Sequence, residues 1–223
     1  MIGRISEVFD SVQGEGLYLG QRQLFVRFFG CNLACGYCDT IMNNFMEYAP
    51  DELCREIALY EDDFHSVSFT GGEPLLQSDF LKEILRFNLQ RRCNNYLETN
   101  GTLCGELEKV IDDVDIIAMD MKLPSSGKMV NVWGMHRRFL KIASRKEVFL
   151  KSVICESTKE DDLREALNII KEVDPGAIYV LQPNYYDKGP ALKQKLEDFR
   201  DICQQERVTA CVIAQMHKIT GLR

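Results

Sequence analysis

Short apolar runs alternate along the chain with longer amphipathic stretches. The apolar runs are rich in β-branched and aromatic residues, which is typical of buried strands. We predict strands over 23–29, 65–70, 95–99, 115–122, 147–154, 177–182 and 207–214. In the longer stretches apolar residues recur at helical spacing, as Leu53, Ile57 and Tyr60 do. We predict helices over 50–61, 78–92, 158–173 and 190–204.

Strands that alternate with helices indicate βαβ units and a parallel sheet. The units are too few for a closed eight-stranded barrel, so an incomplete barrel and an open doubly wound sheet both fit the pattern. Both are α/β folds, and the pattern alone does not choose between them. No linker interrupts the alternation, so residues 1–223 are expected to form a single domain. Segment 124–138 fits neither pattern.

Details of the pattern give two further expectations. Thr158 is the expected N-cap of the helix over 158–173, with Asp161 at the capping-box position. The first ten residues mix apolar and acidic side chains and lack the pattern of a secretory signal.

Composition and charge narrow the class of protein. The chain of 223 residues is 45% hydrophobic and 27% charged, with a net charge of −7. A protein that binds nucleic acid through bulk electrostatics would be basic, so no nucleic-acid partner is expected. No apolar run approaches the roughly 20 residues of a membrane span, so no membrane association is expected. We therefore expect a cytoplasmic protein.

Three of the nine cysteines are clustered. Cys31, Cys35 and Cys38 have the spacing C-x3-C-x2-C, whereas the other six stand singly. Cytoplasmic thiols stay reduced, so a disulfide framework is not expected. The cluster could bind structural zinc with a distant fourth ligand, or Cys35 and Cys38 could form a redox pair. It could also bind an iron–sulfur cluster, in which three thiolates leave one iron open for substrate binding.

Chemically distinctive residues follow several of the predicted strands. The cysteine loop follows the first, "TGGEP" (70–74) the second and "ETNG" (98–101) the third, while "DMK" (120–122) and "QPN" (182–184) end later strands. Carboxyl ends of parallel strands lie at one edge, where α/β proteins bind ligands. We expect these motifs to form one site.

The cysteine spacing, with Tyr37 before the last cysteine, and "TGGEP" resemble the radical S-adenosylmethionine (SAM) superfamily. The segments "DSVQGEG" (10–16), "FVRFFGCNLACGYCDT" (25–40), "FTGGEPLL" (69–76), "ETNGT" (98–102), "MDMK" (119–122) and "MHK" (216–218) resemble the 7-carboxy-7-deazaguanine synthase family of 7-deazapurine (queuosine) biosynthesis. The resemblance extends from about residue 5 to the end of the chain. It implies an α/β fold, an incomplete (partial) TIM-type barrel of about six parallel strands with flanking helices.

This resemblance implies the cofactors. Cys31, Cys35 and Cys38 would bind a [4Fe–4S] cluster whose fourth iron binds SAM, and Thr40 would bind Mg²⁺. By resemblance, the residues that contact SAM are Tyr37, Cys38, Asp39, Gly72, Glu73, Asp120, Met121, Lys122, Gln182, Pro183, Asn184 and Tyr185. Gly71 and Gly72 let a ligand approach the backbone, which would leave the Glu73 carboxylate free to accept hydrogen bonds from SAM.

The resemblance also implies the substrate site, formed by Val12, Gln13, Gly14, Glu15, Arg27 and Thr70. Arg27 lies on the same side of its strand as Phe25, and its buried guanidinium needs an anion. That anion would be the substrate carboxylate by resemblance, or a structural Asp or Glu. Thr40 could equally be a loop hydrogen-bonder, and Asp120 and Lys122 a structural ion pair.

The function implied is that of a radical SAM lyase. It converts 6-carboxy-5,6,7,8-tetrahydropterin to 7-carboxy-7-deazaguanine with loss of ammonia, through an Mg²⁺-dependent radical ring contraction. A flavodoxin- or ferredoxin-type electron donor and a homodimer are expected. Two alternatives are a glycyl-radical-enzyme activase of the same superfamily and a non-catalytic metal-binding module.

Overall fold

One curved sheet runs through the computed structural model, which describes residues 1–40, 43–60 and 63–221. Its strand order is β3-β1-β2-β4-β5-β6-β7-β8-β9. Neighbours from β2 to β9 pair in parallel, whereas β1 pairs antiparallel with β2 and with β3. The strands are β1 (Gly3–Val12), β2 (Arg22–Phe28), β3 (Met46–Tyr48), β4 (Ser66–Gly71), β5 (Asn94–Thr99), β6 (Ile116–Asp120), β7 (Glu147–Ile154), β8 (Tyr179–Pro183) and β9 (Ala210–Val212).

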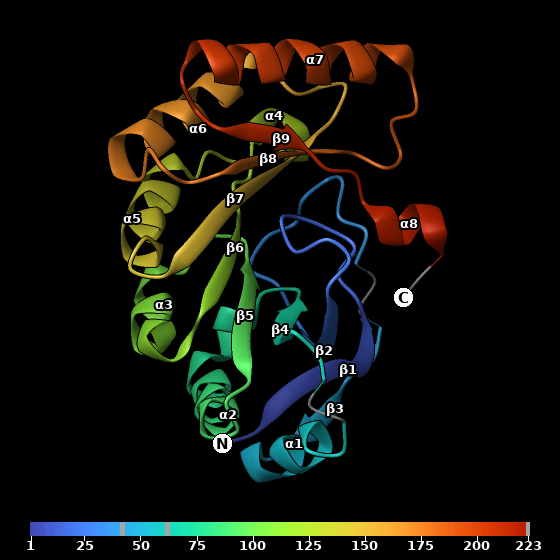
Figure 1. Ribbon diagram of the computed structural model, residues 1–223, viewed down its shortest axis with the longest axis vertical. Helices are drawn as coiled ribbons and strands as arrows, with labels where there is room; N and C mark the ends of the chain where they lie inside the picture. Colours follow the sequence, from blue (N-terminus) through green and yellow to red (C-terminus); the bar gives the residue numbers. More distant parts are fainter. Residues whose placement is uncertain (41–42, 61–62, 222–223) are drawn as a thin grey trace.

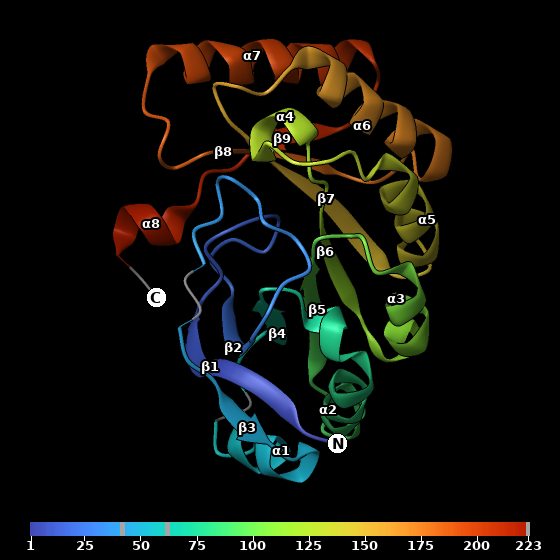
Figure 2. The same cartoon turned by 180° about the vertical axis from the view of Figure 1, so that it is seen from behind.

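Helices cover the outer face of this sheet (Figures 1 and 2). Helices α2, α3, α5, α6 and α7 follow the strands around the curve, while α8 lies on the other side, near the loops that occupy the inner face. The helices are α1 (Pro50–Ile57), α2 (Ser78–Gln90), α3 (Cys104–Val110), α4 (Pro124–Gly127), α5 (Trp133–Ala143), α6 (Glu160–Val173), α7 (Pro190–Gln205) and α8 (Met216–Thr220).

The expected incomplete barrel is confirmed. The sheet curves but does not close, because its strand order ends at β3 on one side and at β9 on the other. The parallel part has one strand more than the six or so expected, and β1 and β3 were not predicted. The sequence of β1, "GRISEVFDSV", exposes or half-exposes most of its residues, so no apolar run marks it as a strand.

Two other details differ from the sequence predictions. The N-cap of α6 is Lys159 and not Thr158. Thr158 is buried, and its hydroxyl accepts a hydrogen bond from the backbone N–H of Cys155 at 2.7 Å, so it serves the turn after β7. Segment 124–138, which showed no clear pattern, contains α4 and the start of α5.

The two faces of the sheet carry different side chains. In β2, Leu24, Val26 and Phe28 are fully buried in the core between sheet and helices. The alternate residues Phe25 and Arg27 point to the inner face, where they line a cavity. Arg27 therefore lies on the same side as Phe25, as predicted. The outer face stabilises the fold, and the inner face is available for chemistry.

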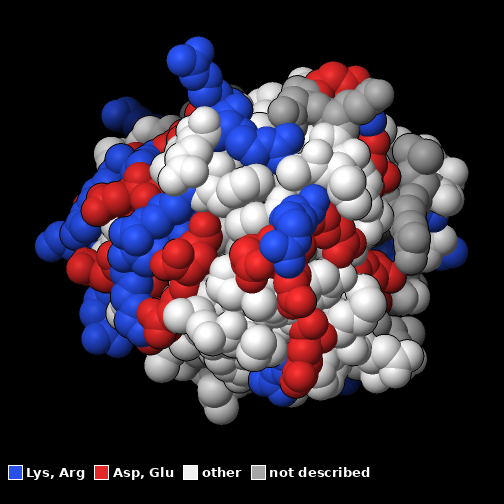
Figure 3. All heavy atoms as spheres, turned by 90° about the horizontal axis from the view of Figure 1, so that it is seen from below, with Lys and Arg blue, Asp and Glu red and all other residues white. Residues whose placement is uncertain are grey.

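Within the described part of the chain, no helix combines the length and apolar character needed to cross a membrane. The face seen from below carries basic and acidic side chains side by side (Figure 3).

Candidate active site

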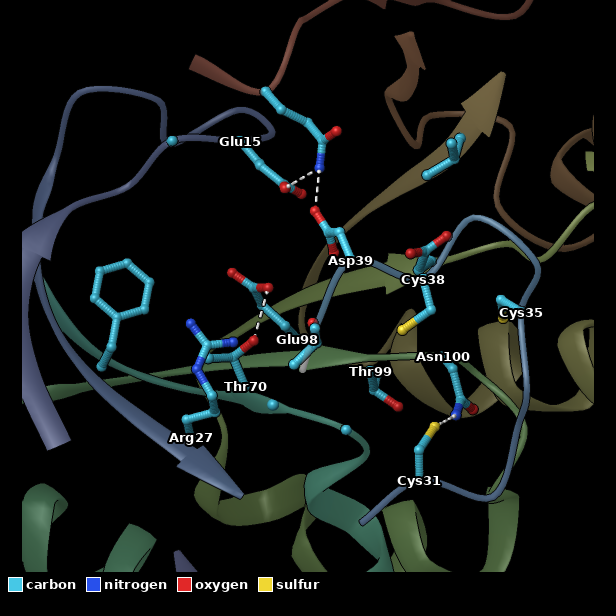
Figure 4. Close-up of a pocket in the computed structure, with 18 of the residues that line it drawn as sticks. Glu15, Arg27, Cys31, Cys35, Cys38, Asp39, Thr70, Glu98, Thr99 and Asn100 are labelled. Carbon is cyan, nitrogen blue, oxygen red and sulfur yellow. Dashed lines mark hydrogen bonds between the residues drawn. The ribbon is translucent and has the colours of Figure 1, made fainter. Parts of the chain in front are cut away.

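A cavity of about 740 Å³ opens on the inner face, at the carboxyl ends of the parallel strands (Figure 4). This volume is within the range of pockets that bind small molecules and cofactors. Motifs from the cysteine loop, β4, β5, β6 and β8 all contribute lining residues. The sequence prediction that these motifs form one site is therefore confirmed.

The cysteine loop forms one wall of the cavity. Cys31, Cys35 and Cys38 all line it; Cys31 and Cys38 are exposed and Cys35 is half-buried. The other six cysteines, all within the described residues, do not line it. Thiolates are the ligands that iron–sulfur clusters take. The donor set therefore fits such a cluster.

No three His, Cys, Asp or Glu side chains of the described residues converge on a position where a single metal ion could sit. The loop is instead held by its backbone: the Gly36 N–H donates to the carbonyl oxygen of Gly127 at 2.9 Å. A Cβ on Gly36 would lie 3.2 Å from that oxygen, so glycine permits this close approach.

The glycine motif brings β4 against the start of the cysteine loop. Gly71 has a φ of +126°, and a Cβ there would lie 2.3 Å from the carbonyl oxygen of Phe28. Only glycine meets both conditions. The Gly72 N–H donates to the same Phe28 oxygen at 3.1 Å, and the Glu73 N–H donates to the Gly30 carbonyl at 2.8 Å. Gly71 and Gly72 both line the cavity.

The Glu73 side chain already has hydrogen-bond partners within the protein, which the sequence did not reveal. It is fully buried and is not among the lining residues. Its carboxylate accepts hydrogen bonds from the Asn100 N–H at 2.7 Å, the Thr99 hydroxyl at 2.9 Å and the Leu75 N–H at 3.1 Å. Glu73 thus ties the end of β5 to the glycine motif. A contact between Glu73 and SAM stays a prediction.

Burial raises the pKa of the Glu73 carboxyl to about 7, although its hydrogen-bond donors act in the opposite direction. The ordinary pKa of this carboxyl is 4.5. Between pH 4.5 and about pH 7, Glu73 therefore holds a proton in the folded protein that it has lost in the unfolded chain. The free energy of unfolding contributed by this group therefore falls as the pH rises through this window, by about 3 kcal/mol.

Replacing Glu73 by glutamine should remove this pH dependence. Relative to the parent, the variant's free energy of unfolding should rise by about 3 kcal/mol between pH 4.5 and pH 7. Urea unfolding of both proteins across that range measures the difference, in which the titration of all other groups cancels. A difference that is independent of pH would contradict the raised pKa.

Lys122 lies beside the cysteine loop. Its Nζ is 2.7 Å from Asp120 Oδ2 and lies over the Tyr37 ring, 5.4 Å from the centroid. Asp120 and Lys122 both line the cavity, so they face the same side, as predicted. They also form the structural ion pair that the sequence left open.

Two acceptor atoms at the cavity have no partner in the protein. Asp120 Oδ1 and Gln182 Oε1 are buried without a protein hydrogen-bond partner although both residues line the cavity. Such acceptors fit a ligand with N–H or O–H donors.

The wall opposite the cysteine loop carries a network of charged groups. Lys151 Nζ lies 2.6 Å from Glu15 Oε2 and 3.9 Å from Glu98 Oε2. Glu98 also accepts hydrogen bonds from Gln13 Nε2 at 2.9 Å and from the Thr70 hydroxyl at 3.1 Å (Figure 4). This wall therefore combines two carboxylates and one ammonium with neutral donors.

Arg27 has a protein partner in this structure. Its Nε lies 3.2 Å from Glu7 Oε2, and its guanidinium lies 5.6 Å from the centroid of the Phe9 ring. This ion pair is the structural alternative considered for Arg27. The side chain is 26% exposed and lines the cavity, and a guanidinium has five N–H donors. A second anion can therefore approach it from the cavity.

The C-terminal segment joins the two walls. Gln215 Nε2 donates to Glu15 Oε1 at 2.9 Å and to Asp39 Oδ2 at 3.3 Å (Figure 4). Lys218 Nζ lies 3.0 Å from the same Asp39 oxygen, and the Met216 N–H donates to the Gly14 carbonyl at 2.9 Å. Chain segments about 200 residues apart are thus brought together here.

Most of the predicted site residues line the cavity. They are Val12, Gln13, Gly14, Glu15, Arg27, Cys31, Cys35, Tyr37, Cys38, Asp39, Thr40, Thr70, Gly72, Asp120, Lys122, Gln182 and Asn184. Four predicted SAM contacts do not line it: Glu73, Met121, Pro183 and Tyr185. The Met121 side chain lies in the core on the other face of the sheet because it alternates with Asp120 and Lys122. Tyr185 instead packs against Tyr186.

Sequence reasoning missed several lining residues. Lys151 had a visible signal, because a lysine inside the apolar strand "EVFLKSVI" must be buried and paired. The motif that contains Glu98 was noted without a definite role. Asn100, Gln215 and Lys218 belong to motifs or segments whose position only the fold reveals.

Comparisons with known proteins agree with this geometry. A model of the Radical SAM superfamily matches residues 25–173. The chain is 41% identical over 202 residues to 7-carboxy-7-deazaguanine synthase of Geobacter sulfurreducens, with 80% of each chain covered. It is 33% identical to the protein of that name from Archaeoglobus fulgidus across the whole of both chains.

Among solved structures, the crystal structure of QueE from Escherichia coli aligns with a TM-score of 0.65 at 17% identity. It covers 95% of this chain and 94% of that chain, and it shows that the two share a fold. The sequence matches carry the assignment further: the chain belongs to the 7-carboxy-7-deazaguanine synthase family of the radical SAM superfamily.

Proposed function

We infer that the protein converts 6-carboxy-5,6,7,8-tetrahydropterin to 7-carboxy-7-deazaguanine, with loss of ammonia. The observation that carries this inference is one cavity in which the cysteine loop faces a polar wall formed by Glu15, Arg27 and Glu98. Membership of the superfamily implies a [4Fe–4S] cluster and SAM. A non-catalytic metal-binding module would need no such second wall.

The cysteine loop would hold the cluster through Cys31, Cys35 and Cys38. When bound and reduced, this cluster supplies the electron that cleaves SAM to a 5′-deoxyadenosyl radical. The protein contributes position and exclusion of water. The unpartnered acceptors of Asp120 and Gln182 would bind donors of SAM, and Lys122 would hold Asp120 in place.

The opposite wall would hold the pterin. Its carboxylate would lie against the guanidinium of Arg27, which can donate in parallel to both carboxylate oxygens. Glu7 already holds Arg27 through Nε and so orients the group. The ring has N–H donors, which the acceptors of Gln13 and Glu98 suit, and Thr70 lies beside Glu98 at 3.1 Å.

Thr40, at the end of the cysteine loop, would bind Mg²⁺ between loop and substrate carboxylate. A hydroxyl is a hard ligand, and Mg²⁺ takes few protein ligands and keeps several waters. The Thr40 side chain lines the cavity. We propose that this site holds the metal in the same cavity as the cluster.

Replacing Thr40 by valine keeps the shape of the side chain and removes its hydroxyl. We expect the Mg²⁺ concentration for half-maximal turnover to rise about 10- to 100-fold, the range in which removing one supporting group weakens metal sites. Iron content and SAM affinity should stay at parent values. A variant with a parent Mg²⁺ requirement, or one that has lost its iron, would contradict the assignment.

The central experiment is turnover by the anaerobically reconstituted, reduced protein. With the pterin, SAM and Mg²⁺, we expect 7-carboxy-7-deazaguanine and ammonia in equal amounts, with SAM regenerated. A glycyl-radical-enzyme activase would instead consume SAM, need a protein partner and show no Mg²⁺ requirement. Consumption of SAM without a deazapurine product would overturn the proposed substrate.

Three further expectations belong to this proposal. The electron donor is a flavodoxin or a ferredoxin, the protein is a homodimer, and it acts in the cytoplasm. Reduction by a purified flavodoxin and the mass measured in solution test the first two.

A further inference from the structure

The side chain of Asn100 points from the end of β5 at the cysteine loop (Figure 4). Asn100 is 5% exposed. Its Nδ2 lies 2.8 Å from Asn32 Oδ1 and 3.9 Å from Cys31 Sγ. The Asn100 amide therefore faces both Cys31, which would bind the cluster, and Asn32, the residue that follows it.

The orientation of this amide is fixed by its other contacts. Asn100 Oδ1 accepts hydrogen bonds from the Thr102 hydroxyl at 2.6 Å and from the Thr102 N–H at 3.2 Å. A backbone N–H can only donate, so the atom facing it must be the oxygen. The NH₂ group consequently faces the cysteine loop, and both of its hydrogens have an acceptor there.

The backbone of Asn100 is held just as firmly. Its N–H donates to the buried Glu73 carboxylate at 2.7 Å, and its carbonyl lies 3.2 Å from His136 Nε2. His136 is fully buried. A donor with so little freedom contributes its interaction at little entropic cost.

We propose that Asn100 is a positioning residue that donates an N–H to the thiolate of Cys31 and thereby raises the reduction potential of the cluster. Hydrogen bonds to cluster sulfurs stabilise the more negative, reduced state. Asn100 acts through Cys31 and not on SAM or substrate. The inference rests on the cluster of the radical SAM superfamily, and not on the identity of the substrate.

Asn100→Leu keeps approximately the volume of the side chain and removes the donor. In the reconstituted protein without SAM, we expect the ratio of reduced to oxidised cluster at a fixed potential to fall about tenfold, which for one electron is about 59 mV. Asn100→Asp adds a negative charge beside the thiolate and should lower the ratio further. Redox titration followed by EPR measures both.

Two matched controls remove other hydrogen bonds of the Asn100 amide and leave its N–H donor to Cys31 in place. Thr102→Val removes the hydroxyl that bonds Asn100 Oδ1, and Asn32→Ala removes the other acceptor of Asn100 Nδ2. We expect both controls to change the ratio less than threefold.

Three results would overturn the proposal. Asn100→Leu could have the parent potential, or the two controls could shift it equally, which would make the effect one of loop structure. Alternatively, Asn100→Leu and the shorter variant Asn100→Ser could both fold, as judged by circular dichroism, and yet bind no iron. Asn100 would then be needed to retain the cluster and would not tune its potential.

The outcome for the parent separates this inference from the proposed function. If the parent itself bound no iron, the proposed function would fail as well. If the parent turned over the pterin while the clusters of the parent and of Asn100→Leu had the same reduction potential, only this inference would fail.

Discussion

Replacing any one of Cys31, Cys35 or Cys38 by alanine should lower turnover by at least about 10³-fold, which corresponds to about 4 kcal/mol of activation free energy. The reason is chemical: the cluster performs the electron transfer, and no protein side chain can substitute for it. Each variant purified under anaerobic conditions should also contain less iron and sulfide than the parent.

Cys54 provides the matched control. It is half-buried in α1 and does not line the cavity. Cys54→Ala should retain the iron, the sulfide and the turnover of the parent. A cysteine-loop variant with parent iron content and turnover would show that the cluster is bound elsewhere.

Replacing Lys151 by methionine should destabilise the fold by about 4 kcal/mol, because it leaves two largely buried carboxylates without their counter-charge. The Lys151 side chain is 10% exposed, and those of Glu15 and Glu98 are 16% and 18% exposed. Burial lowers the pKa of Lys151, but the carboxylates of Glu15 and Glu98 outweigh it and raise that pKa above its usual range. The ammonium is therefore charged in the folded protein.

Urea unfolding at neutral pH measures this loss. Methionine fills much of the same space, so the loss reports on charge more than on packing. The double variant Lys151→Met with Glu15→Gln removes one of the stranded carboxylates and should recover part of the loss. Lys141→Met, at an exposed position at the end of α5, should change stability by less than about 0.5 kcal/mol. A loss equal to that of the control would show that water entering the cavity screens both carboxylates.

Local sequence patterns predicted the parallel part of the fold well. Strands β2, β4 to β8 and helices α1, α2, α6 and α7 lie where apolar periodicity indicated them. Buried strands and amphipathic helices have strong patterns because one face must be apolar. The pattern failed for β1, most of whose residues are exposed or half-exposed, and at Thr158, whose hydroxyl serves a different turn.

The site shows the same division. The cysteine spacing and "TGGEP" predicted a cluster and SAM, because a ligand set within one loop is visible in the sequence. The sequence did not reveal that the Glu73 carboxylate accepts hydrogen bonds from Thr99 and Asn100, since these partners come from another strand. Arg27 was predicted to need an anion, but only the fold identifies Glu7 as its partner.

Sequence patterns predicted the superfamily, the parallel sheet and the cysteine loop, since each depends on residues that are close along the chain. Tertiary structure decided which polar groups meet. Lys151 between Glu15 and Glu98, Gln215 between Glu15 and Asp39, and Asn100 against Cys31 all join distant segments. Their geometry depends on strand register and on how far the sheet curves, and no local pattern encodes either.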